Sequence, residues 1–222
     1  MNIWWRLVQF GFRLLYQELA FTYDLVSNLV SFGQWKNWQK TALNFLPPPS
    51  DQPILDLAHG TGNLHLELIR TGYYQVYGLD LSPQMGRICR RKLHKSGLES
   101  AGLIRGSAYN LPFPDGSFAA IVCTFPTGFI FQPPVLTELH RTLQDQASLI
   151  TVLGAEFTNR HPLTLGIDFL YRITGQRRQS KTDPIPYLNN FGFQARLHEV
   201  PCKMSKVMVL ELKKTHYSQN SS

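Results

Sequence analysis

The sequence of 222 residues contains few cysteines and few charged residues, and it lacks any long uninterrupted apolar segment. Its three cysteines, Cys89, Cys123 and Cys202, have no C-x-x-C spacing and form no cluster with histidine. We therefore expect no metal site, and reduced thiols with a structural role. Arg6 and Arg13 interrupt the apolar N-terminal residues, which excludes a transmembrane span of about twenty apolar residues there.

Charged residues make up 17% of the chain and hydrophobic residues 43%, a balance that argues against disorder and is sufficient for one packed core. The net charge is +7 and the isoelectric point is about 9.4, which fits nucleic acid, a membrane surface or no specific partner. The densest basic run, residues 87–95, is predicted to lie on a helix and is interpreted as a solvated helix face.

A phosphate-binding loop of the form G-x-x-x-x-G-K-[ST] is also missing. A different glycine turn follows a predicted buried strand at 53–57 and precedes a helical apolar pattern. This strand–turn–helix arrangement binds nucleotide-like cofactors at the carboxyl edge of open α/β sheets. The dinucleotide pattern G-x-G-x-x-G is not met, because Gly60 and Gly62 are followed by the large His65 at the third position.

Two acidic residues lie at the ends of the first two predicted strands. Asp56 belongs to the strand at 53–57, and Asp80 closes the strand at 75–79. A carboxylate at the second position can accept hydrogen bonds from both hydroxyls of a ribose. Since no pyrophosphate-binding pattern is present, a nucleoside with a charged, non-phosphate tail fits best, and S-adenosylmethionine is the obvious candidate.

Three blocks of the sequence resemble class I S-adenosylmethionine-dependent methyltransferases. Residues 56–62 (D-L-A-H-G-T-G) resemble their motif I, and residues 78–85 (G-L-D-L-S-P-Q-M) resemble their G-x-D-x-S-x-x-M segment. Residues 106–108 with 111–118 (L-P-F-P-D-G-S-F) resemble a block of the methyltransferase-11 branch, which includes the ubiquinone and menaquinone C-methyltransferases.

An upstream block is similar to the approach helix of that branch, and it consists of Tyr23-Asp24, residues 31–33 (S-F-G) and Trp38. The resemblance spans about residues 23–154 and implies that S-adenosylmethionine is the cofactor. It also implies a set of cofactor-binding residues on the matching positions, namely Asp56, Ala58, His59, Gly60, Gly62, Asp80, Leu81, Met85, Ser107, Ala108 and Thr124.

Four positions depart from the pattern of this family. Ala58 replaces the first motif glycine, which is tolerable if its backbone angle is ordinary. Ser107 replaces an acid that usually accepts from the adenine amino group, and a hydroxyl makes a weaker bond there. Ala119 replaces the acid after Phe118, and residues 144–147 (Q-D-Q-A) replace a P-G-G turn.

The alternation of strands and helices after residue 47 predicts an α/β fold with a parallel sheet. Two adjacent strands at the end of the chain suggest an antiparallel hairpin that completes a Rossmann-like, seven-stranded methyltransferase sheet with helices on both faces. The strands are expected near residues 53–57, 75–79, 102–105, 119–124, 148–153, 194–201 and 206–213.

The predicted organisation has three parts. Residues 1–46 form an N-terminal helical extension, residues 47–214 the methyltransferase domain, and residues 215–222 a flexible tail. Within the domain, residues 157–181 interrupt the alternation and are predicted to be a lid-like insertion over the site.

The catalytic residues are not determined by the sequence. The methyl donor is already activated, so alignment of the reactants supplies much of the rate, and a general base is needed only if the acceptor must lose a proton. The candidates are His59, Tyr23, His161 and Asp168, although His59 is expected mainly to shape the cofactor turn.

The acceptor is expected to be a small apolar molecule. Enzymes that methylate amino groups of bases or glutamines carry an Asn/Asp-Pro-Pro-aromatic run after the fourth strand, and residues 124–129 (T-F-P-T-G-F) do not match it. Nucleic acid is therefore not favoured as a substrate. Four apolar residues suggest an apolar pocket, or alternatively belong to the core, namely Phe125, Phe129, Ile130 and Phe131.

Residues 1–20 combine Trp4, Trp5 and Phe12 with two arginines, which suits a membrane interface. The alternative is that this face packs on the core or the lid. Because no signal-peptide pattern is present, we expect a cytoplasmic protein with peripheral membrane contact. The leading hypothesis is methyl transfer to a quinone-like ring or lipid. The alternatives are a phospholipid or amine N-methyltransferase, and a binding module without turnover.

Overall fold

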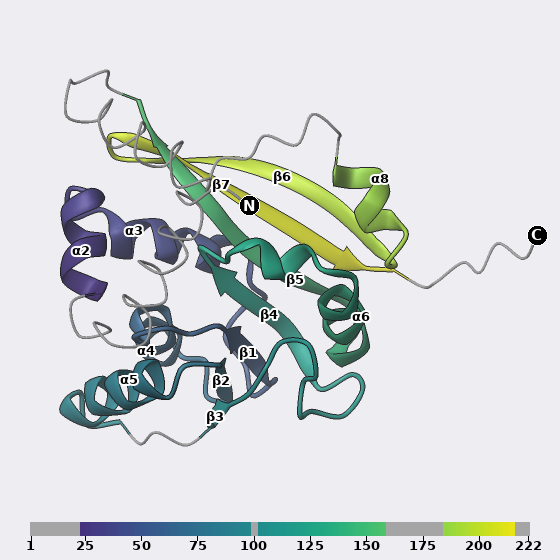
Figure 1. Ribbon diagram of the computed structural model, residues 1–222, viewed down its shortest axis with the longest axis horizontal. Helices are drawn as coiled ribbons and strands as arrows, with labels where there is room; N and C mark the ends of the chain where they lie inside the picture. The colour runs from purple at the N-terminus through teal and green to yellow at the C-terminus, as the bar shows by residue number, and fades with distance from the viewer. Residues whose placement is uncertain (1–22, 99–101, 159–183, 216–222) are drawn as a thin grey trace, which may run out of the picture.

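The computed structural model describes residues 23–98, 102–158 and 184–215, and it contains a seven-stranded sheet with helices on both faces (Figure 1). The strand order is β3-β2-β1-β4-β5-β7-β6; β1 to β5 run parallel, and β7 is antiparallel to both of its neighbours. The strands are β1 (Ile54–Leu57), β2 (Val76–Asp80), β3 (Leu103–Arg105), β4 (Phe118–Thr124), β5 (Leu143–Phe157), β6 (Phe193–Cys202) and β7 (Ser205–Lys214).

The predicted fold class and all seven predicted strands are confirmed. The largest difference is β5, which was expected at 148–153 and runs from Leu143 to Phe157. Its extension at the carboxyl end is explained by pairing with β7, which continues to the pair Phe157↔Ser205, and at its amino end Leu143 pairs with Phe118 of β4. The described helices are α2 (Tyr23–Val30), α3 (Trp35–Lys40), the 3-10 helix η3 (Thr41–Phe45), α4 (Asn63–Arg70), α5 (Pro83–Lys95), the 3-10 helix η4 (Gly128–Phe131), α6 (Pro133–Thr142) and α8 (Pro184–Asn189).

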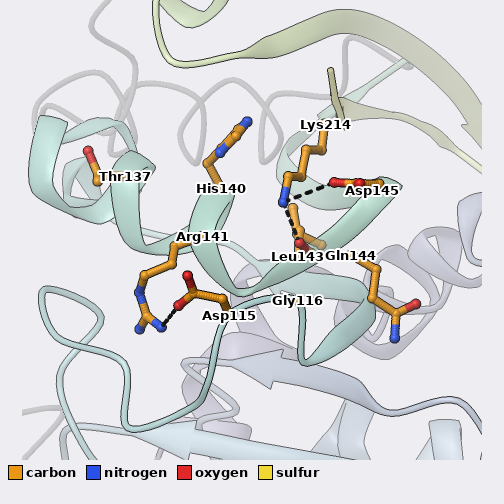
Figure 2. A pocket seen from close by; sticks show the side chains of 9 residues that line it. All are labelled: Asp115, Gly116, Thr137, His140, Arg141, Leu143, Gln144, Asp145 and Lys214. Carbon is orange, nitrogen blue, oxygen red and sulfur yellow. Dashed lines mark hydrogen bonds and ion pairs between the residues drawn. The ribbon is translucent and has the colours of Figure 1, made fainter. Parts of the chain in front are cut away.

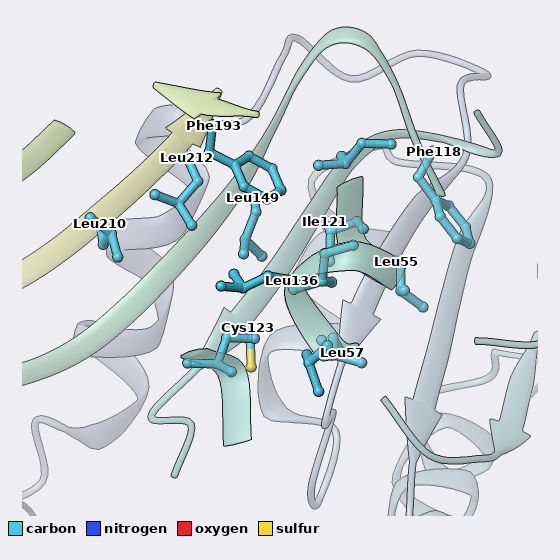
Figure 3. Packing of buried hydrophobic residues seen from close by; sticks show 14 of the residues in the cluster. Leu55, Leu57, Phe118, Ile121, Cys123, Leu136, Leu149, Phe193, Leu210 and Leu212 are labelled. Carbon is cyan, nitrogen blue, oxygen red and sulfur yellow. The ribbon is translucent and has the colours of Figure 1, made fainter. Parts of the chain in front are cut away.

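The side chains of the sheet alternate between two hydrophobic clusters, one on each face. Leu55 and Leu57 of β1 belong to the cluster covered by α6 and α8, which Figure 3 shows around Leu136. Ile54 belongs to the cluster on the other face, which α3 and α4 cover. Asp56 follows the same alternation as Ile54, so its carboxylate points toward α4. This face assignment brings a buried acid under the glycine turn.

The described part of the N-terminal extension is helical, as predicted, and it packs directly on the sheet. Trp35 and Trp38 of α3 are almost completely buried in the second cluster. The indole Nε1–H of Trp38 donates to Ser205 Oγ at 2.7 Å, which ties α3 to the hairpin of β6 and β7. Residues 1–22, including the predicted membrane-binding stretch 1–20, lie outside the described residues.

Two details at the ends of strands bear on the predictions. The backbone N–H of Thr215, the first residue of the predicted tail, donates to Gly192 O at 2.8 Å. Residues 144–147 form no separate turn but lie within β5, where Gln146 adopts a left-handed φ of 63°. Because Leu143 pairs with Phe118, this segment lies at the amino edge of the sheet, away from the glycine turn.

Most of the predicted lid, residues 157–181, lies outside the described residues; only its first two residues are described. Among the described helices, none is long and apolar enough to cross a membrane.

Candidate functional site

The glycine turn between β1 and α4 contains three residues with positive φ. Ala58 has a φ of 55°, Gly60 of 55° and Gly62 of 78°. The backbone of Ala58 is therefore in the left-handed region rather than the ordinary one, which costs free energy for any residue with a Cβ. A Cβ on Gly62 would lie 2.3 Å from Sγ of Cys89, whereas one on Gly60 would meet nothing closer than 4.0 Å. Gly62 thus permits the contact with α5, and the space beside Gly60 is open.

The carboxylate of Asp80 lies at the end of β2 and is held against this turn. Its Oδ2 accepts from the Gly60 N–H and its Oδ1 from the Ser82 N–H, both at 2.8 Å. A carboxylate has about four acceptor positions, so each oxygen keeps capacity for one further donor. Two adjacent hydroxyls of a ribose match this remaining capacity. The residues present therefore fit the nucleoside part of S-adenosylmethionine.

The helix after Asp80, α5, has a capped first turn. Ser82 is the N-cap of α5, since its Oγ accepts from the Met85 N–H at 3.3 Å, and Pro83 occupies the first turn. Leu81 is 69% exposed beside the Asp80 carboxylate, whereas Met85 is fully buried. Of these two predicted cofactor-binding side chains, only Leu81 is accessible to a ligand.

Asp56 and His65 form a buried polar pair beneath the turn. Asp56 is 2% exposed, and its Oδ2 lies 3.4 Å from Nδ1 of the completely buried His65 on α4. Among the described residues, neither this oxygen nor either ring nitrogen of His65 has a hydrogen-bond partner. Polar atoms left in this state are costly and are concentrated at functional sites.

His59 is part of the turn itself and is also nearly buried. Its Nδ1 lies 2.9 Å from Gly60 O, and because a carbonyl only accepts, Nδ1 carries the hydrogen. A Cβ on Gly78 would lie 3.0 Å from both the His59 ring and the His65 ring, so the glycine in β2 makes room for both histidines. This geometry supports a role for His59 in shaping the turn. Among the other catalytic candidates, Tyr23 is the first residue of α2, but its side chain, His161 and Asp168 lie outside the described residues.

A network of four polar residues joins the turn to α2 and α5. Asp24 Oδ1 accepts from Thr61 Oγ1 at 2.6 Å and from Asn63 Nδ2 at 3.0 Å. Lys92 Nζ donates to Asp24 Oδ2 at 3.0 Å, to Asn63 Oδ1 at 2.6 Å and to Thr61 Oγ1 at 3.3 Å. Burial alone would raise the pKa of Asp24, but these hydrogen bonds and the charge of Lys92 hold it below its usual value.

Sequence reasoning missed this network. The sequence predicts that Lys92 lies in the solvated basic run. That interpretation is confirmed for the other members of the run, which are exposed, namely Arg87, Arg90, Arg91, His94 and Lys95. The motif Tyr23-Asp24 gives no role for Asp24. The spacing of Lys92 with the buried Cys89 is the available signal, because residues three apart on a helix lie beside each other.

The loop after β3 carries the two remaining predicted residues of the third block. The Ser107 hydroxyl accepts from the Tyr109 N–H at 3.3 Å, and the Ser107 carbonyl accepts from the Asn110 N–H. Ala108 is half-buried against the first core cluster. The Ser107 side chain therefore helps to close its own turn, and its predicted contact with adenine stays a prediction.

The segment after β4 is covered by aromatic residues of α3. Phe125 adopts a left-handed φ of 52°, which is unusual for a bulky residue. Its ring stacks on Trp35 with 4.0 Å between ring centroids and an interplanar angle of 20°. At the end of β4, Thr124 Oγ1 accepts from Gln39 Nε2 at 3.2 Å. The expected apolar pocket is only partly supported, because Ile130 is a fully buried core residue.

At the opposite, amino edge of the sheet lies an open pocket of about 720 Å³ (Figure 2). Its charged residues are paired. All five N–H groups of Arg141 are used, by Glu138, Asp115 and the carbonyls of Phe113 and Leu111, at 2.8–3.1 Å. Lys214 Nζ donates to Leu143 O at 2.7 Å. The bonds of Arg141 hold the loop at residues 111–115 against α6. None of the residues lining this pocket has a buried side-chain nitrogen or oxygen without a hydrogen-bond partner.

The cysteines do not contribute reactive groups. All three are free. Burial and the nearby Asp56 carboxylate raise the pKa of Cys89 to about 12, and burial raises that of Cys123 well above its usual value. Within the described residues there is no cluster of three or more histidine, cysteine or acidic side chains that could hold a metal ion.

Comparison with known proteins assigns this architecture to a family. A methyltransferase domain family matches residues 54–146. The chain is 36% identical over 192 residues to the demethylmenaquinone methyltransferase of Thermus thermophilus, covering 83% of this chain and 82% of that one. The corresponding enzyme of Thermotoga maritima is 33% identical over 138 residues, 61% of this chain and 58% of its own length.

Solved structures support the fold at low identity. A geranyl diphosphate methyltransferase in complex with S-adenosylmethionine superimposes with a TM-score of 0.63 at 13% identity, covering 81% of this chain and 85% of that one. The geranyl diphosphate C-methyltransferase of Streptomyces coelicolor gives a TM-score of 0.61 at 10% identity, with 80% and 78% covered.

The chain belongs to the class I S-adenosylmethionine-dependent methyltransferases. Within this class it falls in the branch of the menaquinone and ubiquinone C-methyltransferases, as the sequence blocks indicate. It is therefore an enzyme that uses S-adenosylmethionine, and the hypothesis of a binding module without turnover is set aside.

Proposed function

We propose that this enzyme transfers the methyl group of S-adenosylmethionine to a ring carbon of a reduced, quinone-like acceptor. The observation that carries the proposal is the similarity, over most of both chains, to an enzyme named for its action on demethylmenaquinone. The aromatic cover formed by Trp35 and Phe125 beside the end of β4 supports an apolar acceptor. Amine N-methylation has no comparable support from the relatives.

The proposed position of the cofactor is the carboxyl edge of the sheet, over the glycine turn. The open space beside Gly60 would admit the methionine part, and the free acceptor positions of Asp80 would bind both ribose hydroxyls. The exposed Leu81 would pack on the adenine. Asp56, buried below the turn, would favour the positive charge of the cofactor through its field. The other predicted residues, Ala58, His59, Gly62, Met85, Ser107, Ala108 and Thr124, would shape this site mainly through backbone and packing.

The chemistry of the acceptor explains why a reduced ring is proposed. The bound cofactor supplies a methyl group on a positively charged sulfur. A hydroquinone ring carbon is electron-rich and can form the new carbon–carbon bond as the methyl–sulfur bond breaks, after which the ring carbon loses its proton. An oxidised quinone lacks this nucleophilic character. A base for the proton is to be sought in Tyr23, His161 or Asp168, since the geometry of His59 favours a structural role.

The test is a methyl-transfer assay with radiolabelled S-adenosylmethionine and demethylmenaquinone, reduced or oxidised, with phosphoethanolamine as a control acceptor. We expect label in the quinone fraction only under reducing conditions, and a product heavier by one methylene. Label in phosphoethanolamine, or none in the reduced quinone, would contradict the proposal.

We further propose peripheral contact of residues 1–20 with an anionic membrane, from which an apolar acceptor could be drawn. Two surfaces of the described residues support it, one on α2, which follows this stretch in the sequence, and one on α5. Leu25 and Leu29 of α2 are 62% and 66% exposed, and α5, joined to α2 through Lys92, presents exposed arginines.

Vesicle flotation tests this contact with phosphatidylglycerol and phosphatidylcholine vesicles. The full chain should float with the anionic vesicles, and a truncated protein beginning at Gln17 should not. Leu25→Ser with Leu29→Ser should weaken flotation, whereas Leu197→Ser, at a 56% exposed position on β6, should leave it unchanged. Equal flotation of the full and truncated chains would remove residues 1–20 from the interface.

The division into an extension (1–46), a methyltransferase domain (47–214) and a tail, and the lid at 157–181, are likewise proposals. Hydrogen exchange of residues 157–181 with and without S-adenosylhomocysteine and acceptor tests the lid. Equal protection in both states would make it a fixed element.

A further inference from the structure

The network of Asp24, Thr61, Asn63 and Lys92 joins three separate elements at one point. Asp24 comes from α2, Thr61 and Asn63 flank Gly62 at the start of α4, and Lys92 comes from α5. Lys92 Nζ has three acceptors for its three protons, and Asp24 accepts three hydrogen bonds. The four residues bond to one another, so removing one of them leaves polar atoms of the remaining residues without a hydrogen-bond partner.

The turn that this network holds is closely packed and contains one strained residue, Ala58. Gly62 has a φ of 78° and lies so close to α5 that a Cβ would collide with Cys89, while Ala58 adopts a left-handed φ in the same turn. Such backbone persists only where surrounding contacts fix it. Thr61 is 4% exposed, whereas the Asp24 side chain is 37% exposed, so the hydrogen bond between them is partly shielded from water.

The same N-terminal unit reaches the other side of the site. Five residues after α2, α3 begins with Trp35, whose ring stacks on Phe125 beyond the end of β4. Helix α2 is thus bonded to the turn, and its neighbour α3 covers the segment expected to face the acceptor. A change in the position of these helices would therefore alter both the glycine turn and the segment after β4.

We propose that Asp24 and Lys92 are positioning residues, which set the geometry of the glycine turn and make the affinity for S-adenosylmethionine depend on the docking of α2. An isolated exposed ion pair would have little such effect. Here the pair acts through its hydrogen bonds to Thr61 and Asn63. By reciprocity, bound cofactor stabilises the docked position of α2 and of the acceptor-side cover. This inference rests on the proposed position of the cofactor over the turn.

The test measures binding of S-adenosylhomocysteine by calorimetry to the full chain and to Asp24→Asn, Lys92→Met and the double variant, well below their melting temperatures. Each single change should weaken binding about three- to tenfold. The double change should weaken binding no more than the single change with the larger effect, because both residues act through one network. In the methyl-transfer assay, KM for S-adenosylmethionine should rise in proportion while kcat changes less. If Asp24→Asn does not fold, Thr61→Val, which removes one hydroxyl, replaces it.

The matched control is Glu199→Gln with Lys206→Met, which breaks an exposed pair of 3.2 Å on the β6–β7 hairpin and should leave binding unchanged. A lower melting temperature with unchanged affinity in the Asp24 and Lys92 variants would reduce the network to a structural role and overturn the inference. Asp80→Ala separates the two proposals. If it binds the ligand as the unmodified protein does, the proposed cofactor position is wrong; if it loses binding while Asp24→Asn and Lys92→Met retain it, only this inference is wrong.

Discussion

The two edges of the parallel sheet differ in how their polar groups are satisfied. At the amino edge, Arg141 uses all five of its N–H groups, and Lys214 bonds to a carbonyl. At the carboxyl edge, two glycines and Ala58 adopt positive φ, and the buried Asp56–His65 pair has atoms without hydrogen-bond partners among the described residues. The open pocket of about 720 Å³ lies at the amino edge, opposite the proposed position of the cofactor.

The pocket volume points to the amino edge, whereas the state of the buried polar groups points to the carboxyl edge. Left-handed backbone does not distinguish the two edges, because Gln146 at the amino edge has a φ of 63°. Buried polar atoms without partners cost free energy and are retained where a ligand makes use of them. Paired charges with saturated donors hold loops in position. In an open α/β sheet the ligand is also expected at the carboxyl edge. We therefore propose that the amino edge contributes to stability and the carboxyl edge binds the cofactor, and each variant below tests this proposal.

The largest effect is expected from Gly62→Ala at the carboxyl edge. The new Cβ would lie 2.3 Å from Cys89 Sγ and 3.3 Å from the Cys89 Cα, in a backbone with φ of 78°. Strain and overpacking together should lower the free energy of unfolding by about 3 kcal/mol or more. Gly60→Ala is the matched control: its φ is 55° but its Cβ has room, so it should cost about 1–2 kcal/mol. Equal losses in urea unfolding would show that the contact with α5 is not tight.

The next largest loss of stability is expected from Arg141→Met at the amino edge. It removes the hydrogen bonds of Arg141 to Glu138, to Asp115 and to two loop carbonyls, although Glu138 keeps the bond from the Leu111 N–H. The free energy of unfolding should therefore fall by about 2 kcal/mol, a figure discounted because the Arg141 side chain is 29% exposed. Affinity for S-adenosylhomocysteine should stay within about twofold of the unmodified protein. A large loss of affinity with little loss of stability would reverse the assignment of the two edges.

Asp80→Ala tests the carboxyl edge directly. It removes the acceptor proposed for both ribose hydroxyls, and hydrogen bonds to a charged group contribute roughly 1.5–3 kcal/mol each. Affinity should therefore fall at least about tenfold. Asp80→Asn retains one oxygen and should lose less. An unchanged dissociation constant in calorimetry would remove Asp80 from the site.

The sheet could be predicted from the sequence because its determinants are local. Alternating strand and helix patterns, and turns such as the one at Gly60 and Gly62, are properties of short segments. The full length of β5 could not be predicted, because residues 154–157 pair with an antiparallel strand about 50 residues further on. Such pairing follows from the tertiary fold rather than from the pattern of β5 itself.

For the site, the sequence indicated the residues on strand ends but not the contacts between distant side chains. Asp80 follows from its position after a strand. The bond between Asp24 and Lys92 joins residues 68 positions apart, and the fork of Arg141 reaches residues 26 to 30 positions away. The left-handed backbone of Ala58 was also unpredictable, since alanine itself carries no preference for it.

The smallest effect on the free energy of unfolding is expected from replacing one left-handed residue at each edge by glycine. Ala58 with φ of 55° and Gln146 with φ of 63° both stand where the family pattern has glycine or a glycine turn. Glycine removes a cost of about 1–2 kcal/mol at such an angle, but it adds about 0.5–1 kcal/mol of conformational entropy in the unfolded chain. Ala58→Gly and Gln146→Gly should therefore each raise the free energy of unfolding by about 0.5 kcal/mol. Because the residues lie at opposite edges, the two gains should add in the double variant. Calorimetric melting checks both, and a lower melting temperature for Ala58→Gly would show that surrounding contacts, rather than a tolerated cost, favour alanine in the cofactor turn.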